Sequence, residues 1–274
     1  MLSYRHAYHA GNLADVLKHT VLVAVLEAAK TKPAPIDYLD THAGAGVYRL
    51  DDDPRAEHRA GIDALRVAVG TSPPPRSVAT YLECVARTGR ARYPGSAVIA
   101  ATLLREHDRL LLAEMHPSDH TALADAVRRD PRVTLDRGDG YALLKSALPP
   151  RARRGIVLID PAYELAHEPT QVIDGLRGAF ARFRHGVYLV WYPLRGKHDV
   201  GAMRRRFVKL DPPKTLAIEL DARDTTAPGA TGSGVWIVNP PFNAVAELEA
   251  LTVYLGRTLA HGGRAACDWL VPEG

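Results

Sequence analysis

A continuously apolar run, residues 155–159, ends directly at the tetrapeptide Asp160-Pro161-Ala162-Tyr163. A short apolar run of this kind is typical of a strand buried on both faces, as the strands of a parallel sheet are. Open α/β sheets bind ligands at the carboxyl ends of such strands. A carboxylate accepts hydrogen bonds from an amine, and a tyrosine ring stacks on a flat ring. The tetrapeptide therefore predicts a site for a planar ring that carries an amine.

Helical and apolar segments alternate along most of the chain. Asn12 is a candidate N-cap for a helix from Leu13 to about Lys30, which Pro33 and Pro35 end. Strands separated by helices are expected near residues 36–39, 110–115, 133–135, 155–159 and 186–191, and this order predicts a parallel sheet. Two later strands, near 215–220 and 235–239, have little between them and predict an antiparallel hairpin at one edge. A last strand is expected near 266–271.

Residues 51–94 interrupt this alternation. Two helical stretches lie on either side of Ser72-Pro73-Pro74-Pro75-Arg76, and no strand pattern appears. We interpret residues 51–94 as a helical insertion subdomain, and residues 1–50 with 95–274 as one α/β domain. A length of 274 residues suits one large α/β domain or two smaller ones.

The charge balance permits a nucleic-acid partner without requiring one. Lysine and arginine number 35 against 31 acids, a mild excess. Arginines cluster in residues 87–92, 151–154 and 204–206, and such clusters are as often solvated helix faces as binding sites.

The cysteines and the apolar segments favour a reduced, cytoplasmic protein. Cys84 and Cys267 are far apart and form no zinc or disulfide pattern. The first residues lack the apolar core of a secretion signal. No apolar run approaches the ~20 residues of a membrane span, so no membrane partner is expected.

Glycines and acids follow the other predicted strands. His42-Ala43-Gly44-Ala45-Gly46 comes after the first strand and lacks the full pattern of a phosphate loop, which favours a ligand without phosphates over a nucleoside phosphate. A plain tight turn explains these glycines equally well. Glu114 ends the next strand, where a carboxylate can accept both ribose hydroxyls of an adenosine. A surface glutamate is the alternative.

Asp139 and Gly140 follow the third strand. Asp139 could bond an adenine amine while Gly140 leaves clearance for the ring, or Asp139 could simply cap the next helix. Taken together with Asp160, these groups would line one edge of one sheet.

A second turn competes with Asp160. Asn239-Pro240-Pro241-Phe242 matches the Asn/Asp-Pro-Pro-aromatic motif of amino-group methyltransferases more closely than Asp160-Pro161-Ala162-Tyr163 does. Its position argues against it, because it follows the predicted hairpin. The productive turn should follow the fourth strand, beside the glycine-bearing first strand, and this favours Asp160.

The N-terminal segment is rich in aromatic and polar groups. Tyr4 and His6 stand ahead of Lys18 and His19, which sit together on the first helix. Lys18 could supply positive charge to a nucleic-acid backbone. Scattered surface residues are the alternative interpretation.

The whole chain resembles the RlmJ family, which methylates N6 of one adenine in 23S ribosomal RNA. The strings that carry the resemblance are residues 1–6, 9–12, 14–20, 38–46, 93–96, 114–119, 139–140, 160–163, 191–193 and 239–241. The resemblance implies a monomeric class I methyltransferase with a Rossmann-like fold that uses S-adenosylmethionine (SAM) on adenine 2030. It implies Asp160 as the catalytic acceptor and Tyr4 as a substrate contact. The implied cofactor contacts are His19, His42, Ser96, Glu114, Asp139 and Gly140.

The mechanism that follows needs no metal. The Asp160 carboxylate and the Pro161 carbonyl accept the two N–H groups of the amine, which turns its lone pair toward the SAM methyl group. Tyr163 would hold the unstacked base by stacking, with His6 on the leader nearby. Ala162 departs from the family's second proline. Two alternatives stay open: an inactive RNA-binding module with this fold, and a DNA adenine-N6 methyltransferase.

Overall fold

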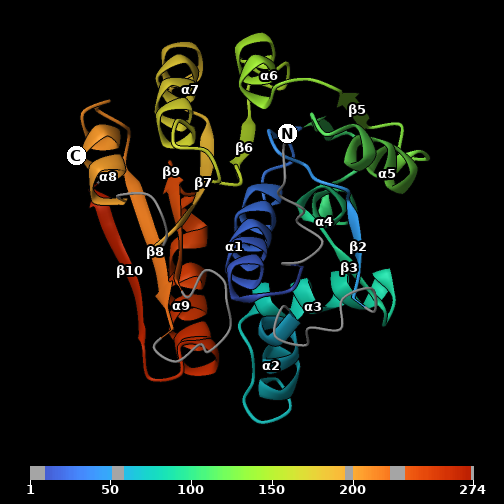
Figure 1. The fold of residues 1–274 in the computed structure, drawn as a ribbon, viewed down its shortest axis with the longest axis vertical. Helices are drawn as coiled ribbons and strands as arrows, with labels where there is room; N and C mark the ends of the chain where they lie inside the picture. The colour runs from blue at the N-terminus through green and yellow to red at the C-terminus, as the bar shows by residue number, and fades with distance from the viewer. Residues whose placement is uncertain (1–9, 51–58, 195–199, 223–231, 273–274) are drawn as a thin grey trace.

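The computed structural model describes residues 10–50, 59–194, 200–222 and 232–272. Within these ranges eight strands form one sheet in the order β10-β8-β9-β7-β6-β1-β4-β5 (Figure 1). The strands are β1 (Asp37–Asp40), β4 (Arg109–Ala113), β5 (Val133–Asp136), β6 (Gly155–Ile159), β7 (Val187–Pro193), β8 (Thr215–Asp221), β9 (Gly232–Val238) and β10 (Arg264–Val271). The α/β fold expected from the sequence is confirmed.

The sheet has a parallel half and an antiparallel half. Strands β5, β4, β1, β6 and β7 pair in parallel, and β9, β8 and β10 continue the sheet in antiparallel pairs. The predicted hairpin is present as β8 and β9. Its expected position at the edge was wrong, because β10 pairs with β8 along nearly its whole length and becomes the outermost strand.

Helices cover both faces, since successive strand residues point into two different cores. Leu158 and Ile156 belong to the cluster that includes α1 (Leu13–Lys30), α4 (Ser96–Leu103), α5 (Pro117–Val127) and α9 (Val245–Leu259). Val157 and Ile159 belong to the cluster of α6 (Gly140–Ala147), α7 (Glu168–Phe183) and α8 (Val200–Val208). This double covering is why strand β6 reads as an unbroken apolar run.

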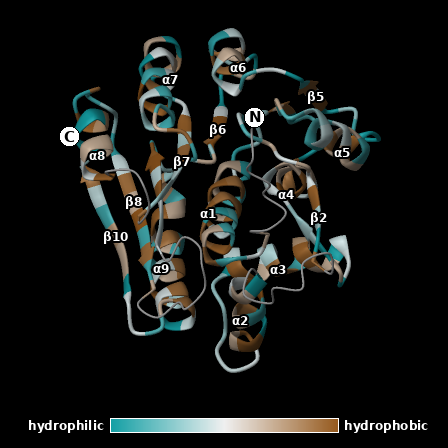
Figure 2. Ribbon diagram, in the orientation of Figure 1, coloured by the Kyte–Doolittle hydropathy of each residue, from teal (hydrophilic) through white to brown (hydrophobic). Residues whose placement is uncertain are grey.

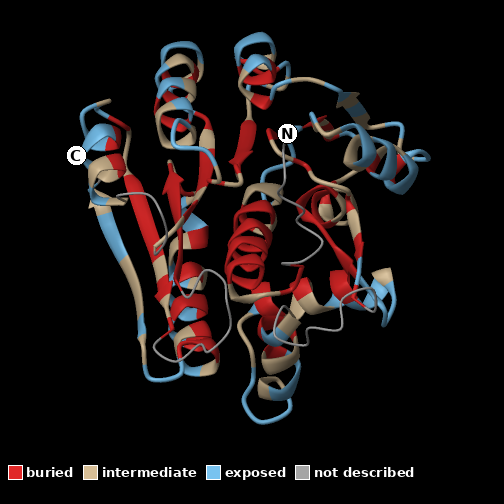
Figure 3. Cartoon of the chain, viewed as in Figure 1, coloured by how far each residue is buried: buried red, intermediate tan, exposed pale blue. Residues whose placement is uncertain are grey.

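Helix α1 is the most buried helix of the fold. The Asn12 side chain accepts from the Asp15 backbone N–H at 2.9 Å, which confirms the predicted N-cap. Figure 3 shows the helix in red along most of its length, and Figure 2 shows hydrophobic colour over the same turns. Even Asp15, Lys18 and His19 are buried. Buried charged groups need ion-pair or hydrogen-bond partners, so this end of the helix must contain such partners.

The segment expected to be wholly helical contains a strand as well. Its helices, α2 (Ala60–Ala68) and α3 (Arg76–Thr88), lie on either side of the proline run as predicted. The expectation of no strand was wrong: β3 (Arg92–Pro94) pairs antiparallel with β2 (Val47–Arg49). Tyr48 and Tyr93 lie opposite one another in this ribbon. Both helices contribute side chains to the core around α1. The division into a domain and a subdomain stays a prediction.

Candidate active site

A cavity of about 510 Å³ opens where the parallel strands end. Strand β1 lies between β4 and β6 in parallel register, with Asp40 opposite both Leu112 and Leu158. The carboxyl ends of these strands therefore meet at one edge, as α/β ligand sites do. The described residues that were predicted to bind the cofactor or the substrate, or to catalyse the reaction, all line this cavity: Lys18, His19, His42, Ser96, Glu114, Asp139, Gly140, Asp160 and Tyr163. Tyr4 and His6 lie outside the described residues.

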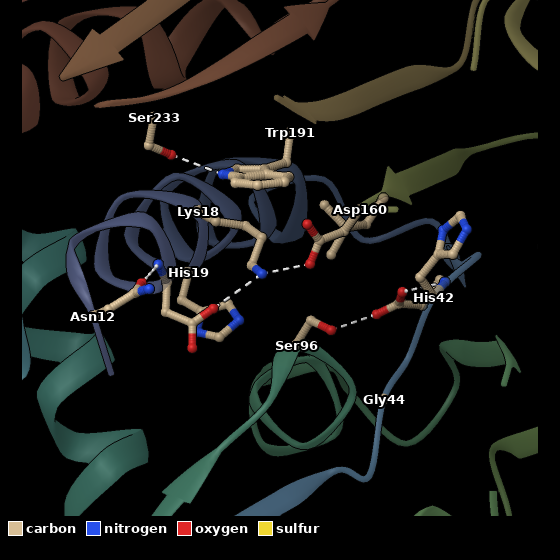
Figure 4. Close-up of polar contacts among 12 residues, drawn as sticks. Asn12, Lys18, His19, His42, Gly44, Ser96, Asp160, Trp191 and Ser233 are labelled. Atoms are coloured by element: carbon tan, nitrogen blue, oxygen red, sulfur yellow. Dashed lines mark hydrogen bonds and ion pairs between the residues drawn. The ribbon is translucent and has the colours of Figure 1, made fainter. Parts of the chain in front are cut away.

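Asp160 is joined to helix α1 through a buried lysine. Lys18 Nζ forms an ion pair with Asp160 Oδ2 and a second with Asp15 Oδ1, the latter at 3.0 Å (Figure 4). The Lys18 side chain is 5% exposed and that of Asp160 is 13% exposed. Asp15 also accepts from the Gly11 backbone N–H at 3.1 Å. Lys18 thus bridges two carboxylates, and the Asp160 carboxylate lies at the cavity wall, where it can accept a hydrogen bond.

An aromatic wall stands beside Asp160. The Trp191 ring lies 5.8 Å from Lys18 Nζ, and its indole N–H donates to Ser233 Oγ at 2.7 Å. Tyr163 takes a left-handed backbone conformation (φ 53°) and donates its hydroxyl hydrogen to the Trp191 carbonyl at 2.9 Å. Only 6% of Tyr163 is exposed. Its ring therefore packs mostly within the wall, whereas Trp191 is half-buried.

A buried carboxylate, Asp40, lies directly behind the cavity wall and binds two residues that line the cavity, Ser96 and His42. It accepts from Ser96 Oγ at 2.6 Å and from the Tyr38 hydroxyl at 2.8 Å, both at Oδ2, and from the His42 backbone N–H at 3.2 Å. Burial raises the pKa of Asp40, while these donors oppose the rise. Through this carboxylate the first turn of α4 is tied to the end of β1.

The Thr41 hydroxyl holds the His42 ring. Thr41 Oγ1 lies 2.7 Å from His42 Nδ1 and 3.0 Å from the Leu158 carbonyl, which also accepts from the Thr41 backbone N–H at 3.1 Å. The single hydroxyl hydrogen can serve either acceptor, so both tautomers of the neutral ring are compatible with this contact. Desolvation, aided by the charge of Lys18, lowers the pKa of His42 to about 4.

Glu114 binds the glycine loop with one oxygen and its own following turn with the other. It accepts from the Gly44 backbone N–H at 2.9 Å and from the His116 backbone N–H at 2.7 Å. Burial raises its pKa, and the two N–H groups counter this. Gly44 has φ +63°, and a Cβ there would lie 2.1 Å from the Tyr48 hydroxyl. The glycine is thus required by the loop, and each Glu114 oxygen retains a second lone pair for a ligand.

Asp139 and Gly140 both have structural roles. Asp139 caps α6 by accepting from the Tyr141 backbone N–H at 3.1 Å, and it is exposed at the cavity rim. A Cβ on Gly140 would lie 2.0 Å from the Thr41 carbonyl oxygen, so close packing against β1 alone requires glycine. Tyr141 crosses to His42 with ring centroids 5.5 Å apart. Its buried hydroxyl has no hydrogen-bond partner among the described residues, so a ligand hydrogen bond could satisfy it.

The competing turn, which begins at Asn239, lies at the opposite end of the strands from Asp160. Strand β9 runs antiparallel to β7, so Asn239 follows the end of β9 that is remote from Asp160. Its amide donates to the Arg184 and Gly186 carbonyls at 2.9 and 2.8 Å. Asn239 does not line the cavity, and Phe242 is 86% exposed. The structure therefore places Asn239 away from the cavity, and the choice of Asp160 as the productive turn stays a prediction.

Comparison with known proteins gives the family. A family model described as "Ribosomal RNA large subunit methyltransferase D, RlmJ" matches residues 33–271. The chain belongs to the RlmJ family. Proteins named "Ribosomal RNA large subunit methyltransferase J" from Escherichia coli (strain K12) and Haemophilus influenzae are 39% and 37% identical, with full coverage of both chains in each case. A crystal structure of a protein from Legionella pneumophila matches with a TM-score of 0.88 at 31% identity, covering 95% of this chain and 98% of that one.

Three residues in or directly behind the RlmJ-type cavity were named only within family strings: Asp15, Asp40 and Trp191. Asp15 stands three positions before Lys18, where a helix places an ion-pair partner. The place of Trp191 beside Lys18 depends on tertiary structure.

Among the described residues, no group of three or more His, Cys, Asp or Glu is arranged to hold a metal ion. Within the same ranges no helix is both long and apolar enough to cross a membrane.

Proposed function

We propose that this protein transfers the methyl group of SAM to N6 of adenine 2030 in 23S ribosomal RNA. Membership of the RlmJ family supports the reaction class. The observation that carries the assignment is the Asp160 carboxylate, held by Lys18 at the wall of a cavity whose other strand ends bear Glu114 and Asp139.

The residues present fit SAM. The two Glu114 oxygens retain lone pairs suited to the two ribose hydroxyls, and the exposed Asp139 carboxylate suits an adenine amine. The predicted cofactor contacts are completed by His19, His42, Ser96 and Gly140, all of which line the cavity. When bound, SAM supplies an electrophilic methyl group on a sulfonium.

Asp160 and the Pro161 carbonyl would act on the target amine. Adenine N6 is a poor nucleophile because its lone pair is delocalised into the ring. Two acceptors that bond its two N–H groups favour a pyramidal nitrogen and aim the lone pair. Asp160 is also placed to take the proton that leaves N6. Lys18 stabilises the carboxylate before transfer. Its side chain is 5% exposed and paired with two carboxylates, so it acts on Asp160 and not on the RNA backbone.

The base must leave its stack to reach this cavity. Tyr163 and Trp191 form the aromatic wall beside Asp160, and their ring centroids are 5.6 Å apart. We infer that this wall contacts the flipped adenine. Tyr4 and His6 are proposed to approach the base from the leader.

We further infer that the protein acts as a monomer in the cytoplasm, where ribosomal RNA is its partner. The proposed mechanism uses no metal. Cys84 and Cys267 are both free thiols, consistent with a reducing compartment.

The test offers labelled SAM to the purified protein with 23S RNA that lacks the modification, with 16S RNA and with duplex DNA. Label in 23S RNA alone is the expected result. Label in DNA would point to a DNA methyltransferase. Binding of SAM and RNA without label transfer would point to an inactive module.

A further inference from the structure

A chain of three rings runs from the cavity into the segment of α3 and β3. His19, on α1, lines the cavity. Its Nδ1 lies 2.8 Å from the Tyr93 hydroxyl of β3, and that hydroxyl lies 2.8 Å from the Tyr81 hydroxyl of α3. All three side chains are at most 1% exposed. The His19 and Tyr93 ring centroids are 5.7 Å apart. Three polar groups buried this deeply form a network whose hydrogens must all be placed.

The Tyr81 hydroxyl fixes the direction of this network. In the described part of the chain it has Tyr93 as its one hydrogen-bond partner. Burial raises the pKa of both tyrosines, so both hydroxyls keep their hydrogens at neutral pH. If Tyr93 donated to Tyr81, the Tyr81 hydrogen would be buried without an acceptor, at a cost of about 1–3 kcal/mol. Tyr81 therefore donates to Tyr93, and the Tyr93 hydrogen is left for His19 Nδ1.

We propose that Tyr93, supported by Tyr81, is a positioning residue that holds His19 as the tautomer with its hydrogen on Nε2. A donor to Nδ1 excludes hydrogen from that nitrogen, so the neutral ring carries it on Nε2. His19 thus becomes a donor at the cavity wall.

The identity of the group that accepts a hydrogen bond from His19 rests on the proposed function. The acidic end of SAM is a carboxylate, which is the strongest acceptor that a neutral N–H can find on this cofactor. The segment around α3 and β3 would then take part in cofactor binding, although Tyr81 itself does not line the cavity. Partners that orient a binding histidine through its second nitrogen are common in metal sites, and the same logic applies to an organic ligand.

The first test needs only the wild-type protein without SAM. Nitrogen-15 NMR of the histidine rings distinguishes the two tautomers, and the His19→Gln variant identifies the His19 signals by their loss. We expect a neutral His19 with its hydrogen on Nε2. Hydrogen on Nδ1 would overturn the proposal, whether or not the protein binds SAM.

Matched phenylalanine variants provide the second test. In Tyr93→Phe the Nδ1 donor is gone, so we expect the His19 nitrogen shifts to move toward a tautomer mixture. We expect the SAM dissociation constant of this variant to rise by about threefold to tenfold. In Tyr81→Phe the Tyr93 hydroxyl can still donate, so the Nε2 tautomer should persist. Equal tautomer behaviour in the two variants would contradict the proposed direction.

The two tests separate this inference from the proposed function. If the wild-type protein shows the expected tautomer but binds no SAM, the positioning of His19 stands and the proposed function fails. If SAM binds and His19 carries hydrogen on Nδ1, the proposed function stands and this inference fails.

Discussion

Two proline-containing turns of similar sequence follow two strands of one sheet, and only one of these turns lines the cavity. Asp160 follows β6, a parallel strand whose neighbour β1 carries the glycine loop. Asn239 follows β9, which runs the other way and ends at the far edge. Asp160 is in a buried ion pair with Lys18, whereas Asn239 donates to two backbone carbonyls and pins the start of β7. The motif nearer to the methyltransferase pattern is the structural one.

The difference shows that strand direction, and not local sequence, decides which of the two turns lines the cavity. Both turns contain a residue with left-handed backbone, Tyr163 at φ 53° and Asn239 at φ 52°. None of the acids and glycines that follow β1, β4 and β5 surrounds Asn239, because they lie at the opposite end of the strands.

The largest expected difference between the turns is catalytic. Asp160→Ala should lower methyl transfer by at least about 100-fold, because it removes the acceptor that orients the amine. SAM should still bind within about tenfold of the wild-type affinity, since a single hydrogen-bonding group facing the amine is lost. Single-turnover transfer and calorimetry measure the two effects. Near wild-type turnover would remove Asp160 from the mechanism and return attention to Asn239.

Cofactor affinity should depend on Glu114 at the Asp160 edge. Glu114→Ala should weaken SAM binding by about 1.5–3 kcal/mol, the range for hydrogen bonds to a charged group, and leave RNA binding unchanged. Calorimetry with SAM measures this loss of affinity. The control is Glu83→Ala, because Glu83 is an exposed residue of α3. Glu114→Gln separates loss of charge from loss of the Gly44 and His116 contacts. Unchanged SAM affinity in Glu114→Ala would take Glu114 out of the site.

The same edge should make stability sensitive to acid through His42. Its folded pKa is about 4, below the roughly 6.5 of an unfolded chain. As the pH falls from about 6.5 to 4, the unfolded state takes up a proton that the folded state does not, so stability is lost in this window. The loss should be on the order of 1–3 kcal/mol. Urea unfolding across this pH range measures it. His42→Gln should flatten the profile and the exposed His107→Gln should not.

At the Asn239 turn the expected effect is on folding. Asn239→Ala leaves the Arg184 and Gly186 carbonyls without their amide donor, which should lower the free energy of unfolding by about 1–2 kcal/mol. Methyl transfer per folded molecule should remain substantial. A loss of turnover as deep as that of Asp160→Ala would break the contrast between the two turns.

The smallest effect is expected at the residue that departs from the family motif. Ala162→Pro should be active and should stabilise the protein by ~0.4–1 kcal/mol, because proline reduces the freedom of the unfolded chain. Thermal unfolding and turnover check this together. A large loss of activity would show that the loop around Asp160 has a geometry of its own.

The strand ends could be predicted because they obey local rules. Apolar runs place β1, β4, β5 and β6, and a glycine or an acid follows each of them. The sequence predicted the hairpin of β8 and β9 but not its position in the sheet. After β9 the chain passes through α9 before β10 pairs with β8, and no local sequence pattern indicates that pairing. The β2–β3 ribbon is three residues long on each side and is separated by the insertion, too short for an alternating pattern.

The site was predicted as far as single residues can predict it. Lys18 and Asp160 are 142 positions apart in the chain, and their ion pair depends on how α1 packs against the sheet. In the sequence Asp40 is an ordinary acid at a strand end, and only the fold buries it behind the lining residues Ser96 and His42. The roles assigned to the lining residues stay proposals.

Mapping the product tests the central claim most directly. Wild-type protein and Asp160→Asn are incubated with SAM and unmodified 23S RNA, and N6-methyladenine is located by mass spectrometry of nuclease fragments. The account predicts one N6-methyladenine, at position 2030, made by the wild-type protein and absent with Asp160→Asn. Methylation of another atom, or an equal yield from Asp160→Asn, would contradict it.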